Sequence, residues 1–407
     1  MVIPADWAWK TLGDVTSLIP GGVYGEEFPR TQLIGMPVAT TAHIEMSDRW
    51  NSKEMNIRYF SKEHVQTYAP QFGDLIVVKS SGSAASIQSG KLGFVDQNRA
   101  GKFIFSNFLM LLRPLNICPK FLYFYVSSNN VKRLIPTLVE ASTYPNIRIP
   151  EYLEVQICVP PLKEQEVIAE ALSDADAAIE SLDALIAKKR DVKQATMQQL
   201  LTGRTRLPGF TADWKEVRLG EHAAFFKGNG LSKSQLIDDG SQLCVHYGEL
   251  FTHYGPVIET VTSKCVAFEG SFKSLAGDVL MPGSDVTPRG LATASAIKFS
   301  DVVLGGDIIV IRTKPTSLYG PFLSNFIRMS KGRVLRLVKG STVYHIHAKD
   351  LADLEVLMPP LKEQEAIAEA LTVMDDELET LNEQVSKLRM VKEGMMQDLL
   401  TGKVRLV

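Results

Sequence analysis

The sequence predicts an α+β fold in which two globular domains are separated by two long helices that form an antiparallel coiled coil. Two observations lead to this prediction. The string PPLKEQEVIAEAL at residues 160–172 returns as PPLKEQEAIAEAL at residues 359–371, with a single change. The stretch before each copy is rich in short runs of β-branched and aromatic residues separated by Gly, Ser and Asn, which is typical of strands. The repeat indicates that one structural plan is used twice.

Four segments follow from the repeat. We expect a globular domain at residues 1–159, a spacer helix at 160–207, a second globular domain at 208–358 and a second spacer helix at 359–407. The globular segments open alike, with DWAWKTLG from Asp6 and DWKEVRLG from Asp213. Each then has a Gly-Asp pair before an apolar strand, and each closes on a Ser-Thr pair, Ser142-Thr143 or Ser341-Thr342.

The elements inside the globular segments follow from the hydrophobic pattern. Short β-branched runs predict strands at residues 74–79, 91–96, 103–114, 301–313 and 354–360. Longer stretches with a helical character predict helices at residues 119–138 and 320–340. Each globular segment is therefore expected to be strand-rich first and helical afterwards.

The repeated segments have the pattern of a coiled-coil seam, with apolar residues in alternating steps of four and three. They are Ile168, Leu172, Ala175, Ile179, Leu182 and Ile186 in the first copy, and Ile367, Leu371, Met374, Leu378, Leu381, Val385 and Leu388 in the second. Proline pairs precede both helices, and Gly203 and Gly402 follow the last leucines, as is typical of helix ends. A helix of about forty residues cannot bury this seam against a small domain, so we expect the copies to pack on each other.

Composition places the chain among ordinary globular proteins, with 407 residues of which 45% are hydrophobic and 22% are charged. The first ten residues lack the basic start and apolar run of a signal peptide, so we expect a cytoplasmic protein. The four cysteines are scattered and form no C-x-x-C pair, which favours free thiols over a zinc ribbon or disulfides. The net charge of −2 disfavours strong nucleic-acid binding by the chain alone, although the acidic surplus lies mainly in the repeats.

A polar string in the repeat recurs unchanged, as Lys163, Glu164, Gln165 and Glu166 and again as Lys362, Glu363, Gln364 and Glu365. Exposed positions have no packing reason to match, so we predict that these residues dock two copies of one partner. Recent gene duplication explains the same identity and stays open as an alternative. For the seam residues, a purely scaffolding role is the simpler interpretation.

The layout as a whole, with P-P-L-x-E-Q opening each helix and LLTG-x-x-R-L closing it, resembles the specificity subunit of Type I restriction–modification systems. The resemblance implies that the two globular segments are target-recognition domains, each reading one half of a split, asymmetric DNA sequence. It further implies that the helices set the spacing and dock two modification (methyltransferase) subunits, which restriction (translocase and nuclease) subunits join. S-adenosylmethionine, ATP and Mg²⁺ would then bind to those partners and not to this chain.

The residues themselves also predict a non-catalytic subunit. An adenine methyltransferase needs an Asn/Asp-Pro-Pro-aromatic motif for the flipped base, whereas the Pro-Pro pairs here follow Val159 and Met358 and precede leucines. A translocase needs G-x-x-x-x-G-K-[ST], and the nearest string, SGKL at residues 89–92, lacks both the first glycine and the final hydroxyl. A coiled-coil protein-interaction adaptor without DNA specificity remains the alternative function.

The candidate DNA contacts are side chains that match base edges or phosphates. In the first domain they are Lys79, Ser80, Ser81, Ser83, Gln88 and Lys91, followed by Tyr144 and Asn146. In the second they are Ser284, Thr287, Arg289 and Thr293, followed by Tyr344 and His345. A flexible solvated loop explains the group from Lys79 to Lys91 equally well, and a structural turn explains the residues after the Ser-Thr pairs. Asp285 departs from the basic pattern of the second-domain loop.

A basic run without acids is a weaker candidate. It comprises Arg328, Lys331, Arg333, Arg336 and Lys339. Such a run is either a solvated helix face or a surface that meets phosphates.

Overall fold

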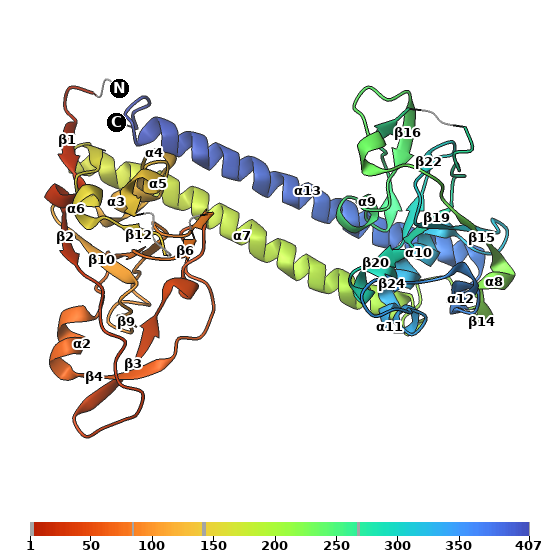
Figure 1. The fold of residues 1–407 in the computed structure, drawn as a ribbon, viewed down its shortest axis with the longest axis horizontal. Helices are drawn as coiled ribbons and strands as arrows, with labels where there is room; N and C mark the ends of the chain where they lie inside the picture. Colours follow the sequence, from red (N-terminus) through yellow and green to blue (C-terminus); the bar gives the residue numbers. More distant parts are fainter. Residues whose placement is uncertain (1–3, 84, 141–143, 267–268, 407) are drawn as a thin grey trace. The chain divides into compact units, whose positions relative to one another are not determined.

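The computed structural model describes residues 4–83, 85–140, 144–266 and 269–406 (Figure 1). The chain forms two compact units, which we call unit 1 (Met1–Asp183 with Gln384–Val407) and unit 2 (Ala184–Glu383). Each unit therefore contains one globular region and a part of both long helices. The boundaries of the four predicted segments stay a prediction, and Ser142-Thr143 lies outside the described residues.

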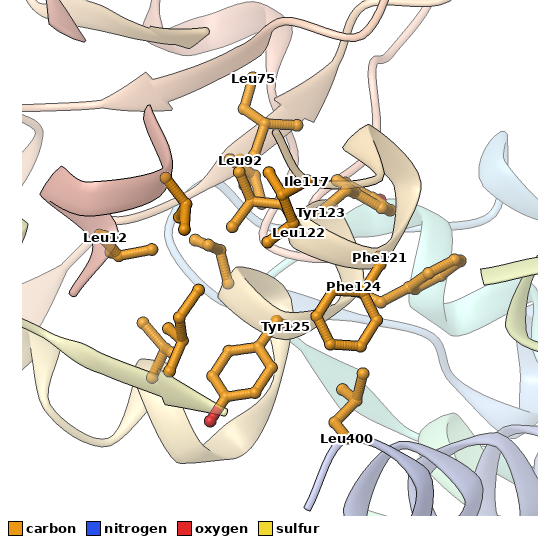
Figure 2. Close-up of a cluster of buried hydrophobic side chains, with 14 of the residues drawn as sticks. Leu12, Leu75, Leu92, Ile117, Phe121, Leu122, Tyr123, Phe124, Tyr125 and Leu400 are labelled. Atoms are coloured by element: carbon orange, nitrogen blue, oxygen red, sulfur yellow. The ribbon is translucent and has the colours of Figure 1, made fainter. Parts of the chain in front are cut away.

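Unit 1 is built around a four-stranded antiparallel sheet. Its strand order is β2 (Thr16–Ile19), β10 (Leu109–Pro114), β5 (Leu75–Val78) and β8 (Leu92–Phe94). Helix α3 (Pro119–Ser127) buries Phe121, Leu122 and Phe124 in the core beside this sheet, and Leu400 reaches the same core from the end of a long helix (Figure 2). A second sheet, β4 (Ile57–Ser61), β3 (Leu33–Ala39) and β9 (Ile104–Phe105), extends the region.

Unit 2 repeats this plan. Its main sheet has the order β15 (Ala223–Lys227), β23 (Ile308–Thr313), β19 (Val279–Pro282), β21 (Ser295–Ile297) and β17 (Val257–Ile258). Helix α10 (Gly320–Met329) buries Phe322, Leu323 and Phe326 against it. The second sheet consists of β18 (Lys264–Cys265), β16 (Gln242–Val245) and β22 (Val303–Leu304).

In both units the strand that enters the globular region pairs with the strand that leaves it. β1 (Ala8–Thr11) runs antiparallel to β13 (Gln156–Val159), and β14 (Lys215–Arg218) runs antiparallel to β25 (Glu355–Met358). The similar opening strings of the two globular segments are thus explained, because each opening strand meets the strand before a proline pair. The described residues include no helix that is long and apolar enough to span a bilayer.

The two long helices are α7 (Leu162–Leu200) and α13 (Leu361–Leu399). In unit 1, Lys392 Nζ lies 2.8 Å from an oxygen of Asp176, and Arg389 pairs with Asp183 at 2.9 Å. In unit 2, Lys189 pairs with Glu377 at 2.5 Å, and Lys193 pairs with Asp375. Residue numbers rise along one helix as they fall along the other, so the predicted antiparallel coiled coil is confirmed within each unit.

Three predicted elements are wrong in length, because the structure divides each of them into shorter helices or strands. The predicted helix at 119–138 breaks at Ser128, whose backbone is extended, into α3, α4 (Asn129–Lys132) and α5 (Ile135–Leu138). The predicted helix at 320–340 is divided into α10 and a short helix, α11 (Lys331–Leu335). The predicted strand at 301–313 splits into β22 and β23, with Asp307 at φ 62° between them.

A buried carboxylate ties the start of each long helix to two distant segments. In unit 1, Glu164 accepts hydrogen bonds from Trp7 Nε1 at 3.0 Å and from the guanidinium of Arg405 at 2.6 and 2.8 Å. In unit 2, Glu363 accepts from Trp214 Nε1 at 3.1 Å and from Arg206 at 2.5 and 2.6 Å. We call each set of Trp, Glu and Arg a clamp.

The glutamine after each clamp glutamate fixes the turn before a globular-domain helix. Gln165 accepts a hydrogen bond from the backbone N–H of Cys118 and donates to the carbonyl of Pro160, both at 2.8 Å. Gln364 accepts from the N–H of Tyr319 and donates to the carbonyl of Pro359, also at 2.8 Å. The same two bonds in both units place α3 and α10 at equivalent points.

We expect Glu363→Ala to destabilise unit 2 by about 1–3 kcal/mol, because Trp214 loses its buried acceptor while Arg206, which is partly exposed, regains water. Urea unfolding monitored by tryptophan fluorescence measures this change. Glu365→Ala is the matched control, since Glu365 is exposed two residues away, and it should alter stability by less than about 0.5 kcal/mol. Equal effects of the two substitutions would contradict the clamp.

Candidate nucleic-acid interface

The candidate groups that are far apart in sequence meet through strand pairing in both units. In unit 1, Ser80 forms an antiparallel bridge with Asn146, and Ile147 N donates to the carbonyl of Lys79 at 2.9 Å. In unit 2, β20 (Ser284–Asp285) pairs with β24 (Tyr344–His345), which places Ser284 opposite His345. Because β5 and β19 precede these bridges in equivalent places, both units have the same backbone frame for different side chains.

The described residues of the first-domain loop include a short hairpin, and the alternative of a flexible solvated loop stays open. β6 (Gly82–Ser83) pairs with β7 (Ser86–Ile87). Gly82 has φ 93°, and a Cβ there would lie 2.2 Å from the carbonyl of Ser86, so the turn requires glycine. Ser89 Oγ accepts from Ser81 N at 3.0 Å and donates to the carbonyl of Pro145 at 2.5 Å. These bonds join the hairpin to the segment that carries Asn146.

Two first-domain candidates lie inside the protein, which corrects the surface position expected for them. Lys91 is 6% exposed, and its Nζ donates to the carbonyl of Thr41 at 3.0 Å and to Gln88 Oε1 at 3.3 Å. Burial lowers the pKa of Lys91. Ser80 is 9% exposed. Both residues support the hairpin from within, and neither offers a surface to a phosphate.

The remaining first-domain candidates stay accessible to different degrees. Ser83 and Tyr144 are exposed, whereas Lys79, Ser81, Gln88 and Asn146 are half-buried. Asn146 Oδ1 is buried and accepts no hydrogen bond from any of the residues that the structure describes. A buried amide oxygen without a donor is uncommon in a folded protein, which makes Asn146 a candidate for contact with an external donor.

The second-domain candidates gather around β20 and β24. The 3-10 helix Pro288–Ala292, which carries the exposed Arg289, lies against both strands. The side chains of Ser284 and Thr287 donate to Asp307 at 3.2 Å and to Asp285 at 2.7 Å. Lys227 lies 3.1 Å from Asp307 and lowers the pKa of that carboxyl. Thr293 and Tyr344 are half-buried and His345 is exposed, so one surface presents hydroxyls, a guanidinium and an imidazole.

The basic run does not form one surface. Arg328 is half-buried, its guanidinium donates to the carbonyls of Ala294, Tyr254 and Gly255, and burial lowers its pKa to about 10. Lys339 pairs with Asp350 at 2.9 Å, and Arg333 donates to the carbonyl of Glu355 at 3.1 Å. Lys331 and Arg336 are exposed, and α11, which carries Lys331, lies against the 3-10 helix.

The predicted docking residues also divide into two groups. The expectation that the whole string faces outward is wrong for Glu164, Gln165, Glu363 and Gln364, which are at most 3% exposed because they form the clamps and the helix-turn bonds. Packing therefore does require these four to recur. Lys163, Glu166, Lys362 and Glu365 are exposed, and their docking role stays a prediction.

Sequence reasoning missed the aromatic and basic members of the clamps. The signal was present, because both globular segments open with Asp-Trp and both helices close on LLTG-x-x-R-L. In unit 1, Arg405 additionally pairs with Asp6 at 2.8 Å. The carboxylates of Asp6 and Glu164 together raise the pKa of Arg405. The recurring Trp and Arg side chains therefore stabilise each unit and are not predicted to contact DNA.

We expect Arg328→Lys to destabilise unit 2 by about 1–3 kcal/mol, because the donors of a compact ammonium group cannot reach all the carbonyls that the Nε and Nη2 groups of the guanidinium bind at separate points. Chemical denaturation of this variant and of Arg336→Lys, the exposed control, provides the measurement. Weaker DNA binding at unchanged stability would show instead that Arg328 contacts phosphates.

The comparisons with known proteins agree with this duplicated frame. A family model described as Type I restriction modification DNA specificity domain matches residues 4–188 and 211–388. The MjaVIII specificity subunit of Methanocaldococcus jannaschii, a Type I restriction enzyme subunit, is 23% identical, with 99% of this chain and 94% of that protein covered. The StySPI specificity subunit of Salmonella potsdam is also 23% identical, with coverages of 99% and 89%.

Solved structures show the same fold. The S subunit of a Type I restriction–modification system from M. genitalium has a TM-score of 0.60 at 17% identity and covers 98% of this chain and 96% of its own. A chain from a study of complex assembly in the Type I system has a TM-score of 0.57 at 18% identity, with coverages of 99% and 100%. Since the family model matches most of the sequence in two ranges, this protein belongs to the family of Type I restriction–modification DNA specificity subunits.

Proposed function

We propose that each unit's globular region reads one half of a bipartite, asymmetric DNA target. The observation that carries this proposal is the shared frame in which Ser80 faces Asn146 in unit 1 and Ser284 faces His345 in unit 2. The same backbone arrangement with different side chains in the two units suits two half-sites that differ in DNA sequence. Family membership supports DNA specificity as the function of this frame, and it does not favour a protein-interaction adaptor without DNA specificity.

The accessible side chains divide by their chemistry. The amide of Asn146 can pair with adenine through one donor and one acceptor in the major groove. Lys79 and Arg289 suit phosphates, and the aromatic rings of Tyr144 and Tyr344 suit stacking or a phosphate. The other candidates, Ser81, Ser83, Gln88, Ser284, Thr287 and Thr293, offer hydroxyl or amide groups to bases or phosphates, and the ring of His345 can donate or accept.

The long helices are proposed to set the gap between half-sites and to dock two modification subunits through Lys163, Glu166, Lys362 and Glu365. One exposed Lys-Glu pair begins each antiparallel helix, so each unit offers one copy of the surface. The chain would be a cytoplasmic, non-catalytic subunit. S-adenosylmethionine, ATP and Mg²⁺ would bind on the modification and restriction subunits, which carry out methylation and cleavage.

The test is co-expression with the modification subunit of its own system, followed by single-molecule methylome sequencing. We expect methyladenine in both halves of one split motif, and we expect that motif to disappear without this chain. A stable complex that methylates no new motif would overturn the proposal and favour the adaptor.

Single substitutions sharpen this test. Asn146→Ala should relax one half of the motif and His345→Ala the other half, because each lies in a different unit. Each mismatched contact is worth about 1–3 kcal/mol, or roughly 5- to 150-fold in affinity. A change in both halves from one substitution would exclude separate reading by the two units.

The phosphate contacts should appear in the salt dependence of DNA binding. The slope of log affinity against log salt for the assembled complex should fall in magnitude by about 0.9 in Arg289→Ala, because one phosphate contact is lost. Arg204→Ala is the control, because Arg204 is exposed just after α7 and is not among the candidate contacts. Fluorescence anisotropy gives both slopes, and identical slopes in the two variants would remove Arg289 from the interface.

The chain by itself should bind DNA weakly at physiological salt, since its net charge is −2. Tight specific binding by the isolated chain in the same assay would contradict this expectation.

A further inference from the structure

The two units differ at one corner of the fold, where the main sheet meets the start of α10. Unit 2 has a groove there of about 1030 Å³. It is lined by the turn before β19 (residues 275–278), the segment between β23 and α10 (residues 313–321), and Glu365 of α13. Because this groove combines an apolar lining with an exposed member of the repeated polar string, it is unlike the candidate DNA surface.

The same corner can be located in unit 1 through matching hydrogen bonds. Asp74 accepts from Gln71 N and pairs with Arg113, as Asp278 accepts from Leu275 N and pairs with Arg312. Opposite Asp74 and Asp278, the N–H groups of Gly73 and Gly277 donate to Val95 and Ile297. Three unit 1 positions thereby correspond to unit 2 positions: Gln71 to Leu275, Phe72 to Ala276 and Phe94 to Ala296.

In unit 1 larger side chains of the protein occupy this corner, although Phe72 itself stays 54% exposed. The ring of Phe72 packs edge-on against Phe94, with centroids 6.1 Å apart and an interplanar angle of 88°. Lys120 Nζ lies 4.1 Å from the centroid of Phe94. Since Gln165 binds Cys118 N and Gln364 binds Tyr319 N, Lys120 corresponds to Pro321. Two alanines and a proline thus replace two phenylalanines and a lysine in unit 2, which leaves the corner open.

At two positions the rim of the unit 2 groove is apolar where the corresponding position in unit 1 is polar. Leu275 is 49% exposed and Val373 is 61% exposed, whereas the corresponding residues in unit 1 are Gln71 and Asp174. A second hollow of about 430 Å³ shares Lys298, Tyr319, Pro321 and Glu365 with the first and continues along α13 to Val373. The second hollow is also lined by Glu369 and Asp376. An apolar groove with polar residues at its rim is typical of a binding site for another protein.

We propose that this groove receives an aromatic side chain and the apolar residues beside it from the modification subunit that docks at the second copy of the polar string. The inference rests on the proposed function. An aromatic anchor is expected because unit 1 places the phenyl ring of Phe72 at the corresponding position. A modification subunit is expected because Glu365 lines both hollows. DNA is disfavoured, since Ala276 precedes β19 and the candidate contact Ser284 follows it at the other end.

The consequence is that the two modification subunits attach in different ways. The one at unit 1 meets a corner already occupied by Phe72 and Phe94 and a polar rim, and the one at unit 2 inserts an anchor. Because buried aromatic anchors dominate the energy of protein interfaces, the unit 2 attachment depends on the groove, while the unit 1 attachment does not.

The test uses the full chain with the modification subunit and counts the bound subunits by native mass spectrometry. The double variant Leu275→Gln, Val373→Asp gives unit 2 the rim of unit 1 at two exposed positions, where folding is little affected. Ala276→Phe fills the groove independently. We expect each to weaken the binding of one subunit about ten-fold or more and to leave the other unchanged. The matched control, Gln71→Leu with Asp174→Val, should keep both affinities within about two-fold.

Three outcomes would overturn the inference. Two subunits bound with unchanged affinity in both groove variants would show that the groove holds nothing of the modification subunit. Unchanged subunit binding with loss of DNA binding would identify the groove as a nucleic-acid site. If the wild-type chain captured no modification subunit, the proposed function itself would fall, which is distinguishable because the failure appears before any substitution.

Discussion

Each unit of this protein depends on a single buried carboxylate at the first turn of a long helix. Glu164 and Glu363 each bind an indole N–H from the start of a globular region and a guanidinium from just beyond the end of the antiparallel helix. A buried carboxylate without such partners is costly, so three distant segments are held at one point. The adjacent glutamine then fixes the start of α3 or α10, and the core of each sheet is built from there.

This shared constraint explains why the two globular regions can differ without a change of fold. The entering and leaving strands, the Asp-Arg pair beside the main sheet and the bridge from Ser80 or Ser284 recur in both units. Between these points the side chains are free to vary. Asn146 and His345 occupy the same place in the backbone frame yet offer different hydrogen-bonding groups, which is what a reader of two unlike half-sites requires.

The sequence predicted the duplicated plan, both long helices and their antiparallel pairing, because heptad spacing and terminal prolines and glycines are local signals. It predicted less well where burial decides the outcome. Lys91 and Arg328 read as surface cations, but carbonyl groups from distant segments surround them, and no local pattern reports such contacts. The polar string was predicted to face outward although its two middle members are buried. Helical periodicity places Glu164 and Gln165 on the inward side, and the sequence gives no sign of their distant partners.

The pairing of entering and leaving strands has an evolutionary consequence. Because β1 lies beside β13 and β14 lies beside β25, the two ends of each globular region adjoin in one short two-stranded ribbon, whose second strand leads into α7 or α13. Recombination at these ribbons could replace an entire region with a foreign one of different length, while the helices keep their register. New recognition would then arise in a single genetic exchange, without the gradual loss of an old specificity.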